Sequence, residues 1–154
     1  MDKTNVMRIL DRAGVSYTAR TYNADVTDGM AVAAATGQEP ERVFKTLVTV
    51  ANTREHCVFA IPVCCKLDLK KAARAAGVKS LEMIAQKQLL PLTGYVHGGC
   101  SPLGMKKALR TWIDETATLY DAITCSAGKL GAQITLAADD LCALSGAQYA
   151  DLTE

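Results

Sequence analysis

The sequence has few aromatic residues and no long hydrophobic run. Aromatic residues make up 5% of its 154 residues although 49% are hydrophobic, so the core must consist mainly of Ala, Val, Leu and Ile. No apolar stretch approaches the roughly 18 residues of a membrane-spanning helix, and the polar N-terminus lacks the apolar centre of a signal peptide. We therefore expect one cytoplasmic domain over residues 1–154, with a substantial core and no membrane partner.

The chain also lacks an excess of charge of either sign. Its 17 Lys and Arg residues nearly balance 16 Asp and Glu residues, which leaves a formal net charge of +1. This excludes a strongly basic nucleic-acid binder, so any contact with tRNA or DNA must be local or assisted by a partner. Two small basic clusters could supply such a contact: Lys66, Lys70, Lys71 and Arg74, and then Lys106, Lys107 and Arg110. The alternative is that they are ordinary solvated surfaces.

The six cysteines and two histidines do not form a recognised metal motif. No C-x-x-C pair occurs, and His56 and His97 lack the spacing of zinc ligands, so we expect no metal and no cofactor. In a chain without an export signal, reduced cysteines that act as small hydrophobic residues are expected. His97 and Cys100 lie three residues apart and could form a nucleophilic dyad, which requires that their side chains meet in space.

The stretch with the most unusual composition is residues 94–104, Gly-Tyr-Val-His-Gly-Gly-Cys-Ser-Pro-Leu-Gly. Gly98 and Gly99 have no Cβ, so the main chain can adopt positive φ there and approach a ligand closely. Such a loop can direct several N–H groups into one concavity that suits an anion or a developing oxyanion. It matches neither the dinucleotide-binding motif nor the P-loop. The alternative is an ordinary Gly/Pro turn between two strands.

Hydrophobic periodicity predicts a mixture of helices and strands. The clearest element is a hairpin that pairs residues 43–51 with 56–63. Further strands are expected at residues 15–22, 81–83, 111–114, 118–124, 132–136 and 148–152. Helices are expected at residues 6–13, 29–36, 69–76, 84–90 and 139–144. Hairpins mixed with crossover connections favour an α+β domain with a mixed, curved β-sheet.

Lys45 occupies an unusual position within the first strand of this hairpin. Alternation places it on the same face as Leu47 and Thr49. An ammonium held by a rigid strand could bind a phosphate or a carbonyl. The simpler interpretation is a lysine near a strand end whose head reaches water.

Four segments stand out by their order along the chain. They are Phe-Lys-Thr-Leu at 44–47, Leu-Asp-Leu-Lys-Lys-Ala-Ala at 67–73, the glycine loop with the preceding Thr93, and Ser-Ala-Gly-Lys at 126–129. Together they resemble the YbaK-type aminoacyl-tRNA deacylase family, which is related to the editing domain of prolyl-tRNA synthetase. The resemblance spans nearly the whole chain. It implies one α+β domain with a half-barrel-like sheet, and an enzyme that hydrolyses the ester between a wrong amino acid and the 3′ adenosine of tRNA.

The resemblance also assigns roles to residues. The expected catalytic group is Lys45, Gly98, Gly99, Cys100 and Ser101. The expected substrate-binding residues are Thr21, Tyr22, Ser126, Gly128 and Lys129, and the two basic clusters are the expected tRNA-binding residues. The sub-branch that the chain most resembles clears cysteine from proline tRNA. This implies the acceptor end of tRNA(Pro) as partner and prolyl-tRNA synthetase as a helper.

Some departures from the family concern the amino-acid pocket. Residues 25–30 contain no aromatic residue where the family often has Phe. Cys100 stands where an aliphatic residue is usual, which favours packing over a nucleophilic role. An acidic residue that some relatives carry near the second glycine turn is absent, and Gln133 lies nearby.

Three hypotheses follow. The first is an editing hydrolase for Cys-tRNA(Pro), with Cys-tRNA(Cys) or esters of alanine and serine as alternative substrates. In it, N–H groups at residues 98–101 stabilise the oxyanion, Lys45 holds the terminal phosphate or ribose, and water or the substrate's own thiol is the nucleophile. The second is a non-catalytic module that binds aminoacyl-tRNA or a nucleotide. The third is a hydrolase that uses Cys100 and His97.

Overall fold

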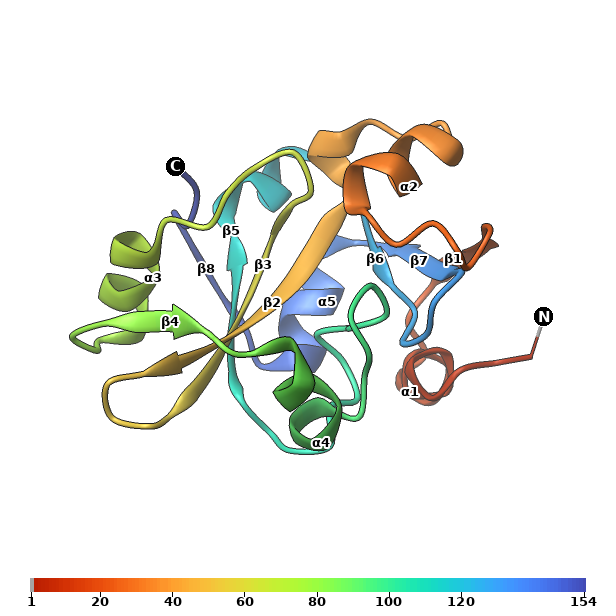
Figure 1. The fold of residues 1–154 in the computed structure, drawn as a ribbon. Coiled ribbons are helices and arrows are strands. Elements are labelled where there is room, and N and C mark those ends of the chain that lie inside the picture. The colour runs from red at the N-terminus through yellow and green to blue at the C-terminus, as the bar shows by residue number, and fades with distance from the viewer. Residues whose placement is uncertain (1) are drawn as a thin grey trace.

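The computed structural model describes residues 2–154, over which eight strands form two sheets (Figure 1). The larger sheet has the order β4 (Leu81–Met83), β2 (Phe44–Ala51), β3 (His56–Pro62), β5 (Arg110–Asp114), β8 (Gln148–Ala150). The smaller has the order β1 (Tyr17–Thr21), β7 (Ala132–Leu136), β6 (Ile123–Ser126). The α-helices are α1 (Asn5–Ala13), α2 (Gly29–Ala35), α3 (Leu69–Ala76), α4 (Leu89–Thr93) and α5 (Ala138–Ser145). None of the helices in this part of the chain is long and apolar enough to cross a membrane.

The β2–β3 hairpin lies at the centre of the larger sheet and confirms the clearest prediction from the sequence. Its strands pair antiparallel, from Phe44 opposite Pro62 to Val50 opposite His56. β3 then pairs in parallel with β5, and β5 in parallel with β8, so the sheet is mixed. Because a parallel pair needs a long crossover, the chain between β3 and β5 has room for α3, β4 and α4.

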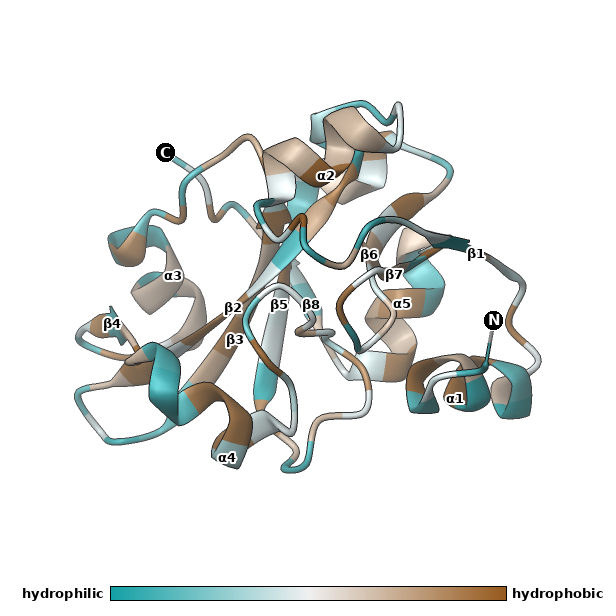
Figure 2. Ribbon diagram, turned by 45° about the vertical axis from the view of Figure 1, so that its right-hand side comes forward, coloured by the Kyte–Doolittle hydropathy of each residue, from teal (hydrophilic) through white to brown (hydrophobic). Residues whose placement is uncertain are grey.

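The main core lies between the two sheets and the helices α1 and α5. It joins Val6 and Leu10 of α1, Val58 of β3, Ile134 of β7 and Leu141 of α5. α1 starts where Thr4 Oγ1 accepts a hydrogen bond from the N–H of Met7, and its exposed side is hydrophilic (Figure 2). A second core forms under α3, where Phe59 and Trp112 stack with ring centroids 5.2 Å apart.

The two sheets meet just before β2, where Val43 forms a parallel bridge with Thr124 of β6. Beyond this bridge they separate, so the strands curve around a core without closing into a barrel (Figure 1). The α+β fold with a mixed sheet is therefore confirmed. The separation matters for function because it leaves part of β2 without a neighbouring strand.

Three local predictions were wrong. The expected strand at 118–124 begins as a 3₁₀ helix, η3 (Glu115–Leu119), because the Asp114 carboxylate accepts hydrogen bonds from Thr116 and favours a turn. The expected helix at 84–90 is a 3₁₀ turn, η2 (Gln86–Gln88), followed by α4, which includes Pro91 in its first turn, where no N–H is needed. The glycine loop consequently joins helix α4 to strand β5 instead of joining two strands.

Candidate functional site

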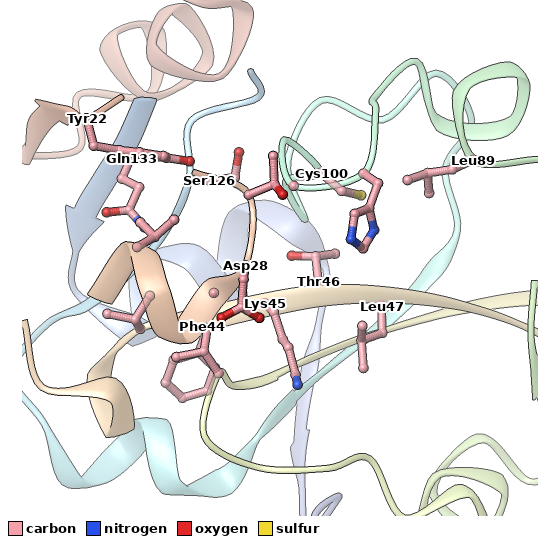
Figure 3. Close-up of a pocket in the computed structure, with 17 residues that line it drawn as sticks. Tyr22, Asp28, Phe44, Lys45, Thr46, Leu47, Leu89, Cys100, Ser126 and Gln133 are labelled. Atoms are coloured by element: carbon pink, nitrogen blue, oxygen red, sulfur yellow. The ribbon is translucent and has the colours of Figure 1, made fainter. Parts of the chain in front are cut away.

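The candidate site is a cavity of about 290 Å³ at the place where the two sheets separate (Figure 3). This volume is close to the lower limit of small-molecule pockets. Its walls come from β2, the start of α2, the glycine loop and the paired strands β6 and β7. Segments far apart in the sequence therefore meet around one opening.

An unpaired stretch of β2 forms one wall. β4 pairs with β2 only over residues 49–51, and the bridge to Thr124 lies before the strand begins. Residues 44–47 therefore have β3 on one side and no strand on the other, and all four line the cavity. The Phe-Lys-Thr-Leu segment is open to a ligand because its neighbouring strand is short.

Thr46 contributes a polar atom without a partner. Its Oγ1 is buried, and no hydrogen-bond partner is found for it within residues 2–154. In Figure 3 its side chain points toward Cys100 and the glycine loop. A buried hydroxyl of this kind is costly unless a ligand pairs with it. Thr46 was not among the site residues predicted from the sequence, although its place beside Lys45 was a usable signal.

Lys45 leaves β2 on the side opposite to Thr46, as strand alternation requires. Figure 3 shows its ammonium directed away from Cys100, with Asp28 nearby. One carboxylate oxygen of Asp28 already has a partner, because its Oδ2 accepts a hydrogen bond of 3.0 Å from the N–H of Ala31 and so caps α2. Lys45 is half-buried and forms no ion pair with any residue from 2 to 154, which leaves its charge for a negative ligand.

The glycine loop reaches the cavity because it packs against the second glycine turn. Gly98 has φ 88°, and a Cβ on Gly99 would lie 3.1 Å from main-chain atoms of Lys129 and Leu130. Side chains are therefore excluded where the two turns touch. Gly98 lines the cavity, whereas Gly99, Gly128 and Lys129 do not.

The N–H groups of this loop differ in availability. The N–H of Gly99 donates to the Val96 carbonyl at 2.9 Å and is not free for an oxyanion. For Gly98 and Cys100, both at the cavity wall, no acceptor of the N–H is found among the described residues. The buried Ser101 lies outside the wall, and its Oγ accepts a hydrogen bond from Leu103. Of the N–H groups at residues 98–101 that were expected to bind an oxyanion, those of Gly98 and Cys100 therefore remain as candidates.

Cys100 and His97 both line the cavity, but the thiol is not activated. Burial raises the pKa of the Cys100 thiol to about 12, so it stays protonated near neutral pH. The thiolate is the nucleophilic form of cysteine. The environment of Cys100 therefore favours a packing role over nucleophilic catalysis. No group of three or more His, Cys, Asp or Glu side chains within residues 2–154 is placed to hold a metal ion.

The opposite wall comes from β6 and β7. Ser126 and Gln133 are directly opposed in this antiparallel pair, and both line the cavity. Ser126 Oγ accepts a hydrogen bond of 3.0 Å from the N–H of Gly128. Tyr22 follows β1 and also lines the cavity, whereas Thr21 does not. Of the expected substrate-binding residues, the structure therefore brings Tyr22 and Ser126 to the cavity.

The two basic clusters lie outside the cavity, and two of their members are held by ion pairs. Lys71 contacts Asp151 at 3.0 Å, and Arg110 contacts Glu55 at 2.6 Å. Arg110 also lies over the ring of Trp112. The remaining members, which are exposed on the surface, are Lys66, Lys70, Arg74, Lys106 and Lys107.

The fold and this cavity together define a class of protein. An open α+β domain presents an unpaired lysine and free N–H groups around a small cavity, which is an arrangement suited to positioning an ester next to a phosphate. Residues 24–144 match the family model described as the aminoacyl-tRNA editing domain. Because the match covers most of the chain, the chain belongs to the aminoacyl-tRNA editing domain family, and the resemblance drawn from the sequence is confirmed.

Individual relatives agree with this assignment. The chain is 44% identical over 153 residues to the Enterococcus faecalis protein named Cys-tRNA(Pro)/Cys-tRNA(Cys) deacylase EbsC, covering 98% of this chain and 93% of the relative. It is 28% identical, with a TM-score of 0.84 and 99% coverage of both chains, to a crystal structure described as a trans-editing enzyme for prolyl-tRNA synthetase. A structure of the hypothetical protein APE2540 is 20% identical, covers 98% of this chain and 100% of its own, has a TM-score of 0.90, and supports the fold. The predicted class of enzyme, a hydrolase that edits aminoacyl-tRNA, is therefore confirmed.

Proposed function

We propose that this protein removes cysteine from tRNA(Pro) by hydrolysing the ester at the 3′ adenosine. The observation that carries the proposal is that one cavity combines the unpaired ammonium of Lys45 with the free N–H groups of Gly98 and Cys100. The choice of cysteine and tRNA(Pro) is supported by the name of the relative that is 44% identical. Cys-tRNA(Cys), which the same name includes, is the second substrate to test.

The ester lies with its carbonyl oxygen at the N–H groups of Gly98 and Cys100. These donors stabilise the negative charge that develops on this oxygen, and one preorganised donor typically contributes about 3 kcal/mol. Lys45 binds the phosphate or ribose at the end of the acceptor strand. Binding the substrate at both places fixes the ester in the geometry needed for attack.

The nucleophile is the thiol of the substrate itself. Its sulfur, as the thiolate, attacks the carbonyl carbon of the same aminoacyl group, the bond from that carbon to the ribose oxygen breaks, and this oxygen takes a proton from solvent. Water then opens the cyclic thioester and releases free cysteine. This route needs no nucleophile from the protein, in agreement with the protonated state of Cys100.

The acceptor strand contacts the protein through the exposed lysines and arginine of the two basic clusters. Because the net charge is only +1, the protein makes few phosphate contacts, and its own affinity for tRNA is low and falls only gradually as salt rises. Prolyl-tRNA synthetase, which already holds tRNA(Pro), supplies the remaining affinity. This places the reaction in the cytoplasm, beside the synthetase.

A panel of charged tRNAs tests the proposal. Release of amino acid is measured for Cys-, Ala-, Ser- and Pro-tRNA(Pro) and for Cys-tRNA(Cys), with Cys-tRNA(Pro) expected to react fastest. S-methylcysteinyl-tRNA(Pro), whose sulfur cannot form a thiolate, should be stable if the substrate thiol is the nucleophile. Rapid release of S-methylcysteine would instead indicate attack by water. Tight binding of Cys-tRNA(Pro) without release of cysteine would contradict the enzymatic proposal.

A further inference from the structure

Gln133 places a buried amide at the wall of the cavity. Gln133 is 5% exposed and lies in β7, directly opposite Ser126 of β6. Paired residues of an antiparallel sheet point to the same face, so the two side chains enter the cavity together. The Oε1 atom of Gln133 accepts a hydrogen bond of 3.0 Å from Nε2 of Gln38. Gln38 itself follows α2 and does not line the cavity.

A chain of hydrogen bonds fixes which end of the Gln133 amide faces the cavity. The Thr36 hydroxyl lies 2.8 Å from the carbonyl oxygen of Val32, an atom that can only accept, so the hydroxyl proton is already used. The Gln38 atom that lies 2.7 Å from Thr36 Oγ1 must therefore be a donor, its Nε2. The second proton of this nitrogen points to Gln133, whose near atom must then be the acceptor Oε1.

The Nε2 group of Gln133 is consequently turned toward the cavity. No acceptor for its two protons is found among residues 2–154. This nitrogen is not among the fully buried side-chain atoms without a partner, so it is accessible from the cavity, where a ligand can supply an acceptor. In Figure 3 Gln133 lies across the cavity from Cys100, with Ser126 between them. A substrate whose ester carbonyl lies at the glycine loop can thus extend its side chain toward Gln133.

We propose that Gln133 adds to the selectivity that the nucleophilic thiol itself provides, by donating a hydrogen bond to the side-chain sulfur of the cysteinyl group, and that Gln38 is a positioning residue that holds the amide in this orientation. The inference rests on the proposed function. A thiolate accepts a hydrogen bond from N–H, whereas a methyl group leaves this donor without a partner. A site built in this way selects cysteine, and to a smaller degree serine, against alanine.

Two substitutions separate the role of the donor from that of its support. Gln133→Leu keeps the volume and removes the donor, so the ratio of kcat/KM for Cys-tRNA(Pro) to that for Ala-tRNA(Pro) should fall about tenfold or more. Gln38→Glu has no proton for Gln133 Oε1 at neutral pH, so the Gln133 amide should turn and present its oxygen to the cavity. This variant should lower the same ratio by a similar factor, although Gln38 touches no substrate.

The double variant provides the readout that a merely structural role would not give. If Gln38 acts only through Gln133, the Gln38→Glu/Gln133→Leu pair should have the same ratio as Gln133→Leu alone. Gln148→Leu, on the exposed edge strand β8, is the matched control and should keep the wild-type ratio. Thermal unfolding of each variant shows whether it is folded, and Gln133→Met serves as a second apolar replacement if Gln133→Leu is not.

The outcomes distinguish the inference from the function on which it rests. If the wild-type protein releases no cysteine from tRNA(Pro), the proposed function is wrong. If wild type is active and folded Gln133 variants keep its preference for cysteine over alanine, the function stands and the role of Gln133 is refuted. Additive effects of the two substitutions would refute the positioning role of Gln38.

Discussion

Replacing Thr46 by Val should make the protein more stable and less active. The two side chains have nearly the same shape, and both suit a β-strand. The Thr46 hydroxyl is buried and has no hydrogen-bond partner within residues 2–154. Burying an unpaired hydroxyl costs about 1–3 kcal/mol, and the substitution removes this cost. For a domain of this size, 1 kcal/mol corresponds to about 2–4 °C in Tm, so Tm should rise by several degrees.

The effect on activity has the opposite sign. If Thr46 bonds the substrate, losing a bond of roughly 1.5 kcal/mol should lower kcat/KM for Cys-tRNA(Pro) about tenfold. Both properties must be measured on one preparation, by differential scanning calorimetry and by release of labelled cysteine. An increase in stability with full activity would mean that the hydroxyl has no ligand role.

Thr49 of the same strand is a matched control. Its buried hydroxyl donates to the Cys57 carbonyl at 2.8 Å, so it already has a partner, and it does not line the cavity. Thr49→Val should therefore lower the free energy of unfolding by about 1 kcal/mol while leaving kcat/KM near the wild-type value. If both variants change stability in the same direction, the reasoning from the unpaired hydroxyl fails.

Other predictions concern the remaining groups. Lys45→Ala should keep the circular dichroism spectrum of the folded protein but deacylate about tenfold more slowly or worse, and Lys45→Arg should recover only part of the rate because a planar fork does not replace a compact charge. Wild-type turnover in folded Lys45→Ala would mean that Lys45 has no catalytic role and that its ammonium simply reaches solvent. Cys100→Ala should retain activity, and the rate should show no titration of this thiol between pH 7 and 9, because its pKa of about 12 keeps it protonated there; loss of activity in a folded variant would revive the Cys/His mechanism. Bare tRNA should bind weakly with a shallow salt dependence, of about −0.9 in log K per phosphate contact in duplex, whereas nanomolar binding at physiological salt would refute the need for a synthetase.

Local signals in the sequence predicted most of the fold. Alternating apolar residues marked the β2–β3 hairpin, and Asp68 with Gly77 marked both ends of α3 because capping is a local interaction. The failure at residues 118–124 has the same origin, since a carboxylate of the preceding strand redirected the chain into η3. Hydrophobic periodicity reports the apolar pattern of a segment but gives no information on a competing hydrogen bond of this kind.

The candidate site was only partly predictable, because its form depends on contacts between distant segments. Alternation placed Lys45 and Thr46 on opposite faces of a strand, which gave no reason to expect both at one cavity. They share it because β4 is short and leaves the edge of β2 open. Likewise, Gly99 suited an oxyanion site by its type, but its N–H is used within the loop by Val96. Only the folded loop shows which N–H groups remain free.

At the cavity, donors that have no partner in the protein lie beside residues that form hydrogen bonds within the loop and between elements. The N–H of Gly99 donates to Val96 within the loop, Ser101 Oγ accepts from the N–H of Leu103, and Gln38 uses both protons of its amide. These residues hold in place the Gly98 N–H and the Gln133 amide, which keep their donors for a ligand. An unpaired donor at a cavity wall can bind an acceptor on a ligand, and the surrounding contacts keep it in position. These unpaired donors are a physical reason to expect that an acceptor-rich ester binds in this cavity.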